Sequence, residues 1–213
     1  VGFAVPGDVV NVRLVRKKKA WLEGVIIKLV KPSEQRLEPF CAHFGVCGGC
    51  RWQPLPYDIQ LAAKQRQVYD QLTRIGHLQV PEFSPIIGSE KTRYYRNKLE
   101  FSASSRRWLS REEVSEGLGD CPGLGFHVGK FFDKVLDIET CHLQPEPTNA
   151  IRLFIKRWCL ERGVSFYNIR ENHGQLRNMF VRNTDAGAVM LIVCFGEDFP
   201  LRAPLLDAVA AQF

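Results

Sequence analysis

Three cysteines lie close together in the run Cys41-Ala-His-Phe-Gly-Val-Cys47-Gly-Gly-Cys50. Gly48 and Gly49 place no side chain between the last two thiols, so a tight turn there can aim all three sulfurs at one centre. An iron–sulfur cluster needs four such ligands, and backbone N–H groups left free by the glycines can donate to its sulfurs. The spacing therefore favours a [4Fe–4S] cluster whose fourth ligand lies elsewhere in the chain.

Zinc is the alternative occupant of such a site, because it also accepts four thiolates. Zinc ligands, however, usually come as two close pairs, whereas here three cysteines cluster and the fourth is remote. A redox-active CxxC pair with a bystander cysteine, or three thiols without any metal, would also explain the pattern. Spacing favours the iron–sulfur cluster over these alternatives.

Four further cysteines could supply the remaining ligand. Cys159 and Cys194 lie in apolar helical and strand patterns, which is typical of buried packing residues. Cys121 precedes Pro122, as the last cysteine of bacterial cluster motifs precedes a proline. Cys141 follows an expected strand and precedes an expected helix, in a turn that suits a ligand. Spacing alone leaves Cys121 and Cys141 open.

Two domains are expected to position these residues. Two β-branched runs, over 9–15 and 21–30, are joined by a basic loop and predict strands of a small antiparallel, OB-like barrel. Residues 1–40 are too few to close such a barrel, so we expect a partial one. Residues 41–213 mix helical and strand patterns and form a second, mixed α/β domain. The predicted fold class is α+β.

Periodicity and capping signals place the other elements of the chain. They are a helix from Tyr57 to a left-handed cap at Gly76, a strand over 95–102 with Tyr95 facing inward, a strand pair over 123–139, a helix between Pro147 and Gly163, a hairpin of 176–182 and 189–195, and a helix over 205–213. The last helix runs to the final residue without a cap, and the chain does not begin with Met. We therefore expect a piece of a longer protein.

The composition excludes several classes of protein. Of the 213 residues, 45% are hydrophobic and 24% are charged, which are ordinary globular values and exclude a disordered tail, a collagen-like fibre and a disulfide-dense scaffold. No apolar run could span a bilayer, and no leader opens the chain. Seven cysteines, an odd number, suit a reducing compartment better than a secreted one. We expect a cytoplasmic monomer without a membrane partner.

The net charge of +6 favours a polyanionic partner, and two basic groups could contact nucleic acid. Alternation would leave Tyr94 free to stack on a base and would direct the neighbouring cations to phosphates. A solvated turn is the simpler interpretation of the first group. The expected contacts are Arg16, Lys17, Lys18 and Lys19 in the hairpin loop, and Arg93, Tyr94, Arg96 and Lys98 in the second domain.

The cysteine run together with three later motifs resembles the RNA uracil-C5 methyltransferases, specifically the cluster-containing branch that modifies 23S ribosomal RNA. These motifs are Trp52-Gln53, Tyr95-Arg96-Asn97-Lys98 and Asp137-Ile138-Glu-Thr-Cys141. The resemblance implies a TRAM barrel followed by a central domain with a [4Fe–4S] cluster, and Val5-Pro6-Gly7-Asp8 resembles the later part of that barrel. It also implies Cys141 as the fourth ligand, leaving Cys121 as a bystander, and RNA as the partner, with ribosomal RNA favoured over transfer RNA.

The resemblance further implies chemistry for which these residues offer no motif. The family needs an S-adenosylmethionine site, a cysteine that attacks the uracil ring and a carboxylate that removes the C5 proton, all in a C-terminal domain. Gly123-Leu-Gly125 is a lone glycine pair and Cys194 has no activating neighbours in the sequence. We therefore assign no catalytic residue and no cofactor-binding residue, expect S-adenosylmethionine only in a missing domain, and expect the segment alone to be inactive.

Two functions from other classes remain as alternatives. A zinc-stabilised nucleic-acid-binding module would use the same cysteines without iron. An electron carrier of ferredoxin type would use the cluster for redox chemistry, but such proteins are usually acidic, unlike this chain.

Overall fold

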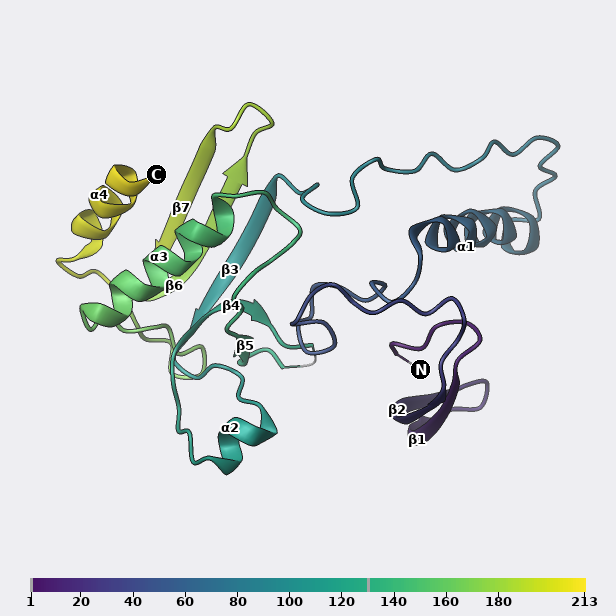
Figure 1. The fold of residues 1–213 in the computed structure, drawn as a ribbon, viewed down its shortest axis with the longest axis horizontal. Coiled ribbons are helices and arrows are strands. Elements are labelled where there is room, and N and C mark those ends of the chain that lie inside the picture. Colours follow the sequence, from purple (N-terminus) through teal and green to yellow (C-terminus); the bar gives the residue numbers. More distant parts are fainter. Residues whose placement is uncertain (1, 130) are drawn as a thin grey trace. The chain divides into compact units, whose positions relative to one another are not determined.

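The structure is a computed structural model that describes residues 2–129 and 131–213. The chain forms two compact units, the first comprising Val1–Gly45 and Cys50–Thr92 and the second Val46–Gly49 and Arg93–Phe213. Figure 1 labels their helices and strands in chain order. The cysteine loop thus contributes residues to both units. The expected boundary between residues 40 and 41 stays a prediction.

The first unit begins with an antiparallel hairpin of β1 (Val9–Lys17) and β2 (Leu22–Lys31). This confirms the two strands expected from the β-branched runs. No closed barrel is formed by the residues that the structure describes, and the hairpin is a separate two-stranded sheet.

The turn before β1 is held by a buried carboxylate. Asp8 accepts hydrogen bonds from the N–H of Val5 at 2.7 Å and of Ser33 at 2.9 Å, and it pairs with Arg36 at 3.4 Å. Its side chain is only 1% exposed. Burial raises the pKa of Asp8, but the two N–H groups and the Arg36 charge together lower this pKa below its ordinary value. The carboxylate therefore ties the start of β1 to the residues after β2.

Helix α1 (Tyr57–Asp70) continues into a π-helical turn, η1 (Gln71–Ile75). The helix confirms the prediction, but the left-handed cap at Gly76 was wrong, because Gly76 has a φ of −76°. The N–H of Gly76 instead closes the wide turn on the Gln71 carbonyl at 2.8 Å. A Cβ at Gly76 would lie 2.7 Å from the Leu72 carbonyl oxygen, so close backbone approach is what requires glycine here.

The second unit is built on a five-stranded antiparallel sheet in the order β5-β4-β3-β6-β7. The strands are β3 (Lys98–Ser104), β4 (Gly123–His127), β5 (Val135–Leu136), β6 (Leu176–Asn183) and β7 (Val189–Phe195). The strand pair over 123–139 and the hairpin of β6 and β7 are confirmed. The coarse α+β class is likewise confirmed.

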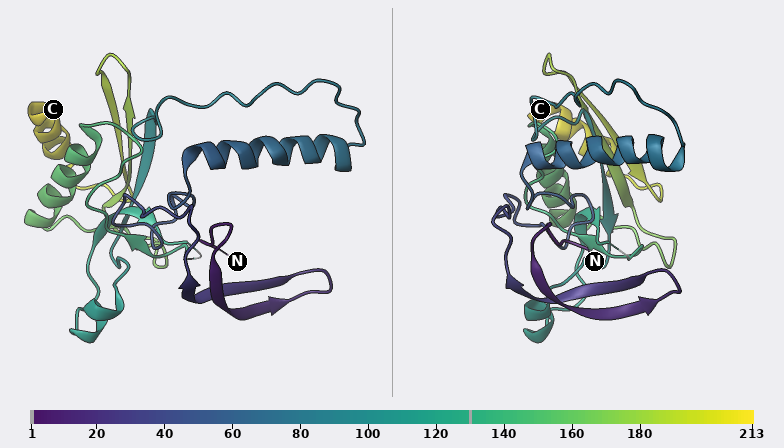
Figure 2. Two further views of the ribbon diagram at one scale, coloured as in Figure 1. Left: turned by 45° about the vertical axis from the view of Figure 1, so that its right-hand side comes forward. Right: turned by 90° about the vertical axis from the view of Figure 1, so that its right-hand side faces the viewer.

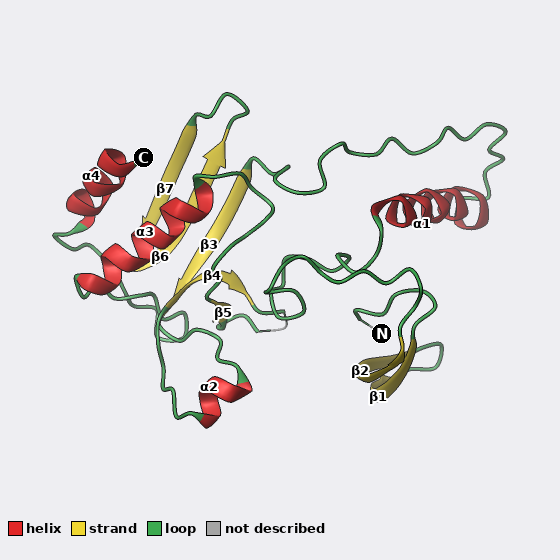
Figure 3. Ribbon diagram, viewed as in Figure 1, coloured by secondary structure: helices red, strands yellow, loops and turns green. Residues whose placement is uncertain are grey.

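Two helices, α3 (Thr148–Glu161) and α4 (Arg202–Gln212), lie on the same side of this sheet (Figures 1 and 2). The core is formed by apolar side chains from the helices and from alternate positions of the central strands, including Phe101, Ile155, Met179, Val181 and Leu205. A third, short helix, α2 (Arg111–Ser115), begins at a capping box of Ser110 and Glu113. Figure 3 shows these helices in red beside the yellow strands. Within the described residues of this unit, no helix covers the opposite face of the sheet.

The segment before β3 differs from the prediction. Tyr95 was expected to face inward, but it is exposed, because the strand begins only at Lys98. The N–H groups of Tyr94 and Arg96 instead donate to the carbonyls of His142 and Leu143, each at 2.8 Å. This local pairing turns Tyr95 away from the core.

The helices of the described chain are all too short or too polar to cross a membrane.

Candidate functional site

Cys47 and Gly48 of the cysteine loop belong to the second unit and pair there with the last residue of β4 and the residue that follows it. Cys47 forms an isolated antiparallel bridge with Val128, and the N–H of Gly48 donates to the His127 carbonyl at 3.3 Å. A Cβ at Gly48 would lie 2.8 Å from that carbonyl oxygen, so only glycine permits this approach. The N–H of Gly49 points at the Cys47 sulfur, 3.5 Å away. This is the kind of donor that tunes a ligating thiolate.

Cys141 lies buried at the turn between β5 and α3. Its backbone is held from both sides by the side chain of Asn149, whose Oδ1 accepts from the Cys141 N–H at 2.8 Å and whose Nδ2 donates to the Cys141 carbonyl at 3.2 Å. The Asn149 amide is itself oriented by Glu146, 2.9 Å away. The position of Cys141 is therefore fixed by the first turn of α3.

A buried cation accompanies Cys141. Arg152 of α3 is fully buried and donates to the carbonyls of Leu124 at 3.0 Å and Glu139 at 2.8 Å. Burial lowers the pKa of Arg152, and the charges of Asp137, Cys141 and Glu146 oppose this shift.

The chemical type of the four predicted ligands is therefore the one that an iron–sulfur cluster requires. All four predicted ligands, Cys41, Cys47, Cys50 and Cys141, are cysteines, and a [4Fe–4S] cluster takes four thiolates. Cys41 and Cys50 belong to the first unit, and Cys47 and Cys141 to the second. Across residues 2–129 and 131–213, no three His, Cys, Asp or Glu side chains gather as a metal site. The convergence of the four sulfurs stays a prediction.

The remaining three cysteines take part in core packing or in backbone pairing. Cys159 lies on α3 with its side chain buried in the core, and burial raises its pKa to about 12. Cys194 lies on β7 opposite Asn178 of β6. The carbonyl of Cys121, the alternative fourth ligand, accepts a hydrogen bond from the Arg107 N–H at 2.8 Å.

The second basic group lies directly beside the Cys141 turn. Tyr94 has a φ of +54° and shares a hydrogen bond of 2.9 Å between its hydroxyl and Nδ1 of His142. The backbone N–H of Tyr94 also donates to the carbonyl of His142. The sequence-predicted contacts Arg93, Tyr94, Arg96 and Lys98 are all exposed. The structure thus places an exposed tyrosine and three exposed cations next to a predicted cluster ligand.

The first basic group spans the end of β1 and the hairpin loop. Its members Arg16, Lys17, Lys18 and Lys19 are exposed. The Arg16 guanidinium lies 5.7 Å from the ring centroid of Trp21, and the Lys18 N–H donates to the Trp21 carbonyl at 2.9 Å. The tip therefore presents four cations beside an exposed indole, an arrangement that suits a phosphate backbone.

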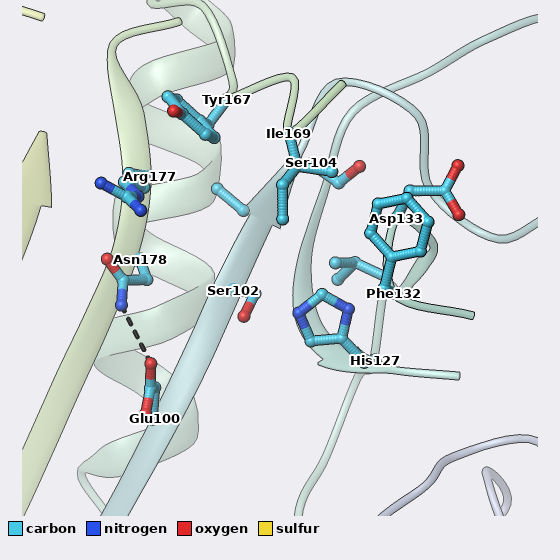
Figure 4. Close-up of a pocket in the computed structure, with 12 residues that line it drawn as sticks. Glu100, Ser102, Ser104, His127, Phe132, Asp133, Tyr167, Ile169, Arg177 and Asn178 are labelled. Carbon is cyan, nitrogen blue, oxygen red and sulfur yellow. Dashed lines mark hydrogen bonds between the residues drawn. The ribbon is translucent and has the colours of Figure 1, made fainter. Parts of the chain in front are cut away.

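A pocket that the sequence did not predict lies on the sheet face opposite α3 and α4 (Figure 4). Its volume is about 190 Å³. Its floor is polar, with Glu100 and Ser102 from β3, His127 from β4 and Asn178 from β6. The only sequence signal for it is the polar alternation along β3, which any solvated sheet face would show.

The chain is similar to bacterial proteins described as uncharacterized RNA methyltransferases. It is 48% identical over 221 residues to one from Porphyromonas gingivalis, covering 100% of this chain and 48% of that protein. It is 47% identical over 195 residues to one from Bacteroides thetaiotaomicron, covering 91% of this chain and 43% of that protein. The chain thus spans about half the length of these curated relatives. No family model matches it.

A solved structure shares the fold. The crystal structure of the Pyrococcus abyssi tRNA (uracil-54, C5)-methyltransferase in complex with S-adenosyl-L-homocysteine matches with a TM-score of 0.63 and 27% sequence identity. The match covers 95% of this chain and 42% of that one. The chain is therefore related in sequence to RNA methyltransferases and in structure to a uracil-C5 methyltransferase.

Proposed function

We propose that this chain is the RNA-holding part of an S-adenosylmethionine-dependent RNA uracil-C5 methyltransferase. The observation that carries the proposal is the position of Tyr94 and Arg96, whose backbones pair with the two residues that follow Cys141. Exposed cations and an exposed ring on a backbone fixed at a cysteine turn form a surface suited to single-stranded RNA. The similarity to RNA methyltransferases along the whole chain supports the same function.

On this surface, Tyr94 would stack on an unpaired base, while Arg96 and Lys98 would contact phosphates. Arg16 to Lys19 would add phosphate contacts from the hairpin tip of the first unit. Each phosphate neutralised releases counterions, so the affinity should fall steeply as salt rises. The ligand we favour is ribosomal RNA, as the resemblance of the cysteine motif implies. The structural neighbour is a tRNA enzyme by its title, so both RNA classes belong in the test.

We further propose that Cys41, Cys47, Cys50 and Cys141 hold a [4Fe–4S] cluster. The Gly49 N–H at the Cys47 sulfur and the two hydrogen bonds of Asn149 to the Cys141 backbone support this assignment. When bound, the cluster would supply a covalent cross-link between the cysteine loop and the Cys141 turn. The protein's own part is to orient that turn through Asn149 and to present Tyr94 beside it.

The sequence of residues 1–213 holds no motif for methyl transfer, so this chain is expected to bind RNA without methylating it. The test is the affinity of the anaerobically purified chain for a ribosomal RNA stem-loop and a tRNA arm, measured by fluorescence anisotropy over a range of salt. Arg96→Ala with Lys98→Ala should weaken binding and flatten its salt dependence by about two phosphate contacts. Arg157→Ala, which removes a cation on α3 away from this surface, is the matched control.

Metal analysis of the same preparation tests the cluster. Iron and sulfide that disappear in Cys47→Ser but persist in Cys121→Ser would support the proposed ligands. One zinc per chain without iron would instead support a zinc-stabilised nucleic-acid-binding module. Reversible reduction without any RNA affinity would favour an electron carrier.

A further inference from the structure

The pocket shown in Figure 4 shares no residue with the proposed RNA surface around Tyr94 and Arg96. It lies on the face of the sheet that α3 and α4 leave open, within the second unit. Its volume of about 190 Å³ is below the range of roughly 300–1,000 Å³ typical of sites for drug-sized ligands. It therefore suits one planar ring system and is too small for a whole nucleotide cofactor.

The floor of the pocket is rich in hydrogen-bond acceptors. An N–H of the Asn178 amide donates to the Glu100 carboxylate at 3.0 Å, which fixes both side chains across β3 and β6. This bond uses one of the two lone pairs of Glu100 Oε1, so the Asn178 carbonyl oxygen and both Glu100 oxygens still have acceptor capacity. The Ser102 hydroxyl and the His127 ring lie beside them on the same floor. The floor thus offers acceptors to a ligand edge that carries donors.

The walls of the pocket carry two aromatic rings together with charged groups of Asp133 and Arg177. Tyr167 forms one side, and the Arg177 guanidinium lies over its ring at 5.0 Å from the centroid. A Cβ at Gly196 would lie 2.6 Å from the Tyr167 ring, so glycine there allows the ring to rest on the backbone. Phe132, 65% exposed, forms the opposite side. A pocket lined by two aromatic side chains suits a planar aromatic ligand.

An ion pair and a cation–π contact hold the loop that carries Phe132. Arg170 lies 5.6 Å from the Phe132 ring centroid and pairs with Asp133 at 2.6 Å. This pair ties the loop before β5 to the loop before β6. A large exposed ring with a fixed cation behind it is a ready surface for stacking.

We propose that this pocket binds one unpaired guanine of the RNA, an assignment that rests on the proposed function. Only guanine has two adjacent donors, N1–H and the N2 amino group, on its Watson–Crick edge, and they match a carboxylate such as that of Glu100. Adenine, cytosine and uracil place an acceptor next to their donor on that edge, which a carboxylate repels. Phe132 and Tyr167 flank the ring, and Arg177 lies where it can meet a neighbouring phosphate.

The test uses the whole chain and fluorescent pentanucleotides of uridine whose central nucleoside is uridine, guanosine, adenosine or inosine. Inosine lacks only the N2 amino group of guanosine. The guanosine oligonucleotide should bind roughly tenfold more tightly than the inosine one, as expected for loss of one bidentate contact. Glu100→Gln should bring this ratio close to one without changing affinity for the all-uridine strand. Glu116→Gln, an exposed carboxylate at the end of α2, should leave the ratio unchanged.

A second variant keeps the proposal testable if Glu100→Gln disturbs the folding of the pocket floor. Phe132→Ala removes a mostly exposed ring and should weaken binding of the guanosine oligonucleotide roughly tenfold, the loss expected for one stacked base. Equal binding of guanosine and inosine strands by the unmodified chain would overturn the guanine pocket, while salt-dependent binding lost in Arg96→Ala with Lys98→Ala would still support the RNA surface. Failure of every strand to bind would overturn both proposals.

Discussion

Asn149 holds the backbone of Cys141 from both sides, accepting from its N–H at 2.8 Å and donating to its carbonyl at 3.2 Å. One side chain on the first turn of α3 therefore determines where a predicted cluster ligand lies. Both Asn149 and Cys141 are buried, so neither backbone group could turn to water if the amide were lost.

Asn149→Ala is expected to destabilise the second unit. The substitution leaves a buried N–H and a buried carbonyl unpaired, which costs about 2–3 kcal/mol. Urea unfolding followed by fluorescence of Trp158 measures the change. Asn97→Ala, in an exposed position, serves as the control and should change the free energy of unfolding by less than about 0.5 kcal/mol. A loss no larger than that of the control would show that the Asn149 clamp does not stabilise the turn.

Arg152→Met is expected to destabilise the same unit by about 3 kcal/mol, because the buried carbonyl of Leu124 and the partly buried carbonyl of Glu139 lose the hydrogen bonds that Arg152 donates. The methionine fills most of the volume, so the loss of hydrogen bonds dominates over the cavity. Arg157→Met on the same helix, at a position that is not fully buried, is the matched control. Equal unfolding midpoints for the two variants in urea would contradict a structural role for Arg152.

The burial of Arg152 is a feature of the fold that the sequence does not predict. The apolar positions of α3 and its limits at Pro147 and Gly163 follow from periodicity and capping, and the structure confirms them. Periodicity assigns an arginine to the surface, because it has no information on the carbonyls that β4 and the turn after β5 bring near to this side chain. Burial of Arg152 depends on those distant partners. The prediction for Tyr95 failed for the same reason, since its neighbours pair with residues 142–143 rather than with a strand.

The candidate site likewise has one part that the sequence predicts and another that it does not. Residue type and local spacing predicted Cys41, Cys47, Cys50 and the exposed Tyr94, Arg96 and Lys98, whereas Cys141 as the fourth ligand was implied only by the family resemblance. The pocket was not predicted, because its lining comes from separate strands and loops that only the sheet order brings together. Along β3, Glu100 and Ser102 resemble any pair of solvent-facing residues. Their partner Asn178 lies 78 residues from Glu100 in the chain.

The Cys159 thiol is expected to make the protein less stable at alkaline pH. Burial raises its pKa from 9.0 to about 12, so the folded state holds the proton that the unfolded state releases above pH 9. Stability from this group is complete below pH 9 and is lost as the pH rises from 9 towards 12. At pH 10.5 the loss should be about 2 kcal/mol relative to pH 8. Urea unfolding at both values measures it.

Cys159→Ala provides the comparison, because the variant lacks the titrating group while its other ionisable residues are unchanged. The difference in unfolding free energy between wild type and variant should shrink from pH 8 to pH 10.5. Iodoacetamide at pH 8 should leave Cys159 unmodified in the folded chain and modify it in urea. Rapid labelling of the folded protein would show that the thiol is neither buried nor shifted.

The Asp8 carboxylate is expected to make the first unit sensitive to acid. Its pKa in the folded state lies below the ordinary value of 3.8, since the N–H groups of Val5 and Ser33 and the Arg36 charge outweigh the opposing effect of burial. A lowered pKa means that Asp8 contributes stability above about pH 4 and loses that contribution as the pH falls through its folded pKa. Asp8→Ala should cost about 1–3 kcal/mol at pH 7, because two N–H groups lose their acceptor. Trp21 fluorescence in urea should show wild type and variant converging below pH 3.8, whereas Glu34→Gln, an exposed neighbour, should track wild type throughout. A constant gap between wild type and Asp8→Ala across this range would mean that the charge of Asp8 does not stabilise the turn.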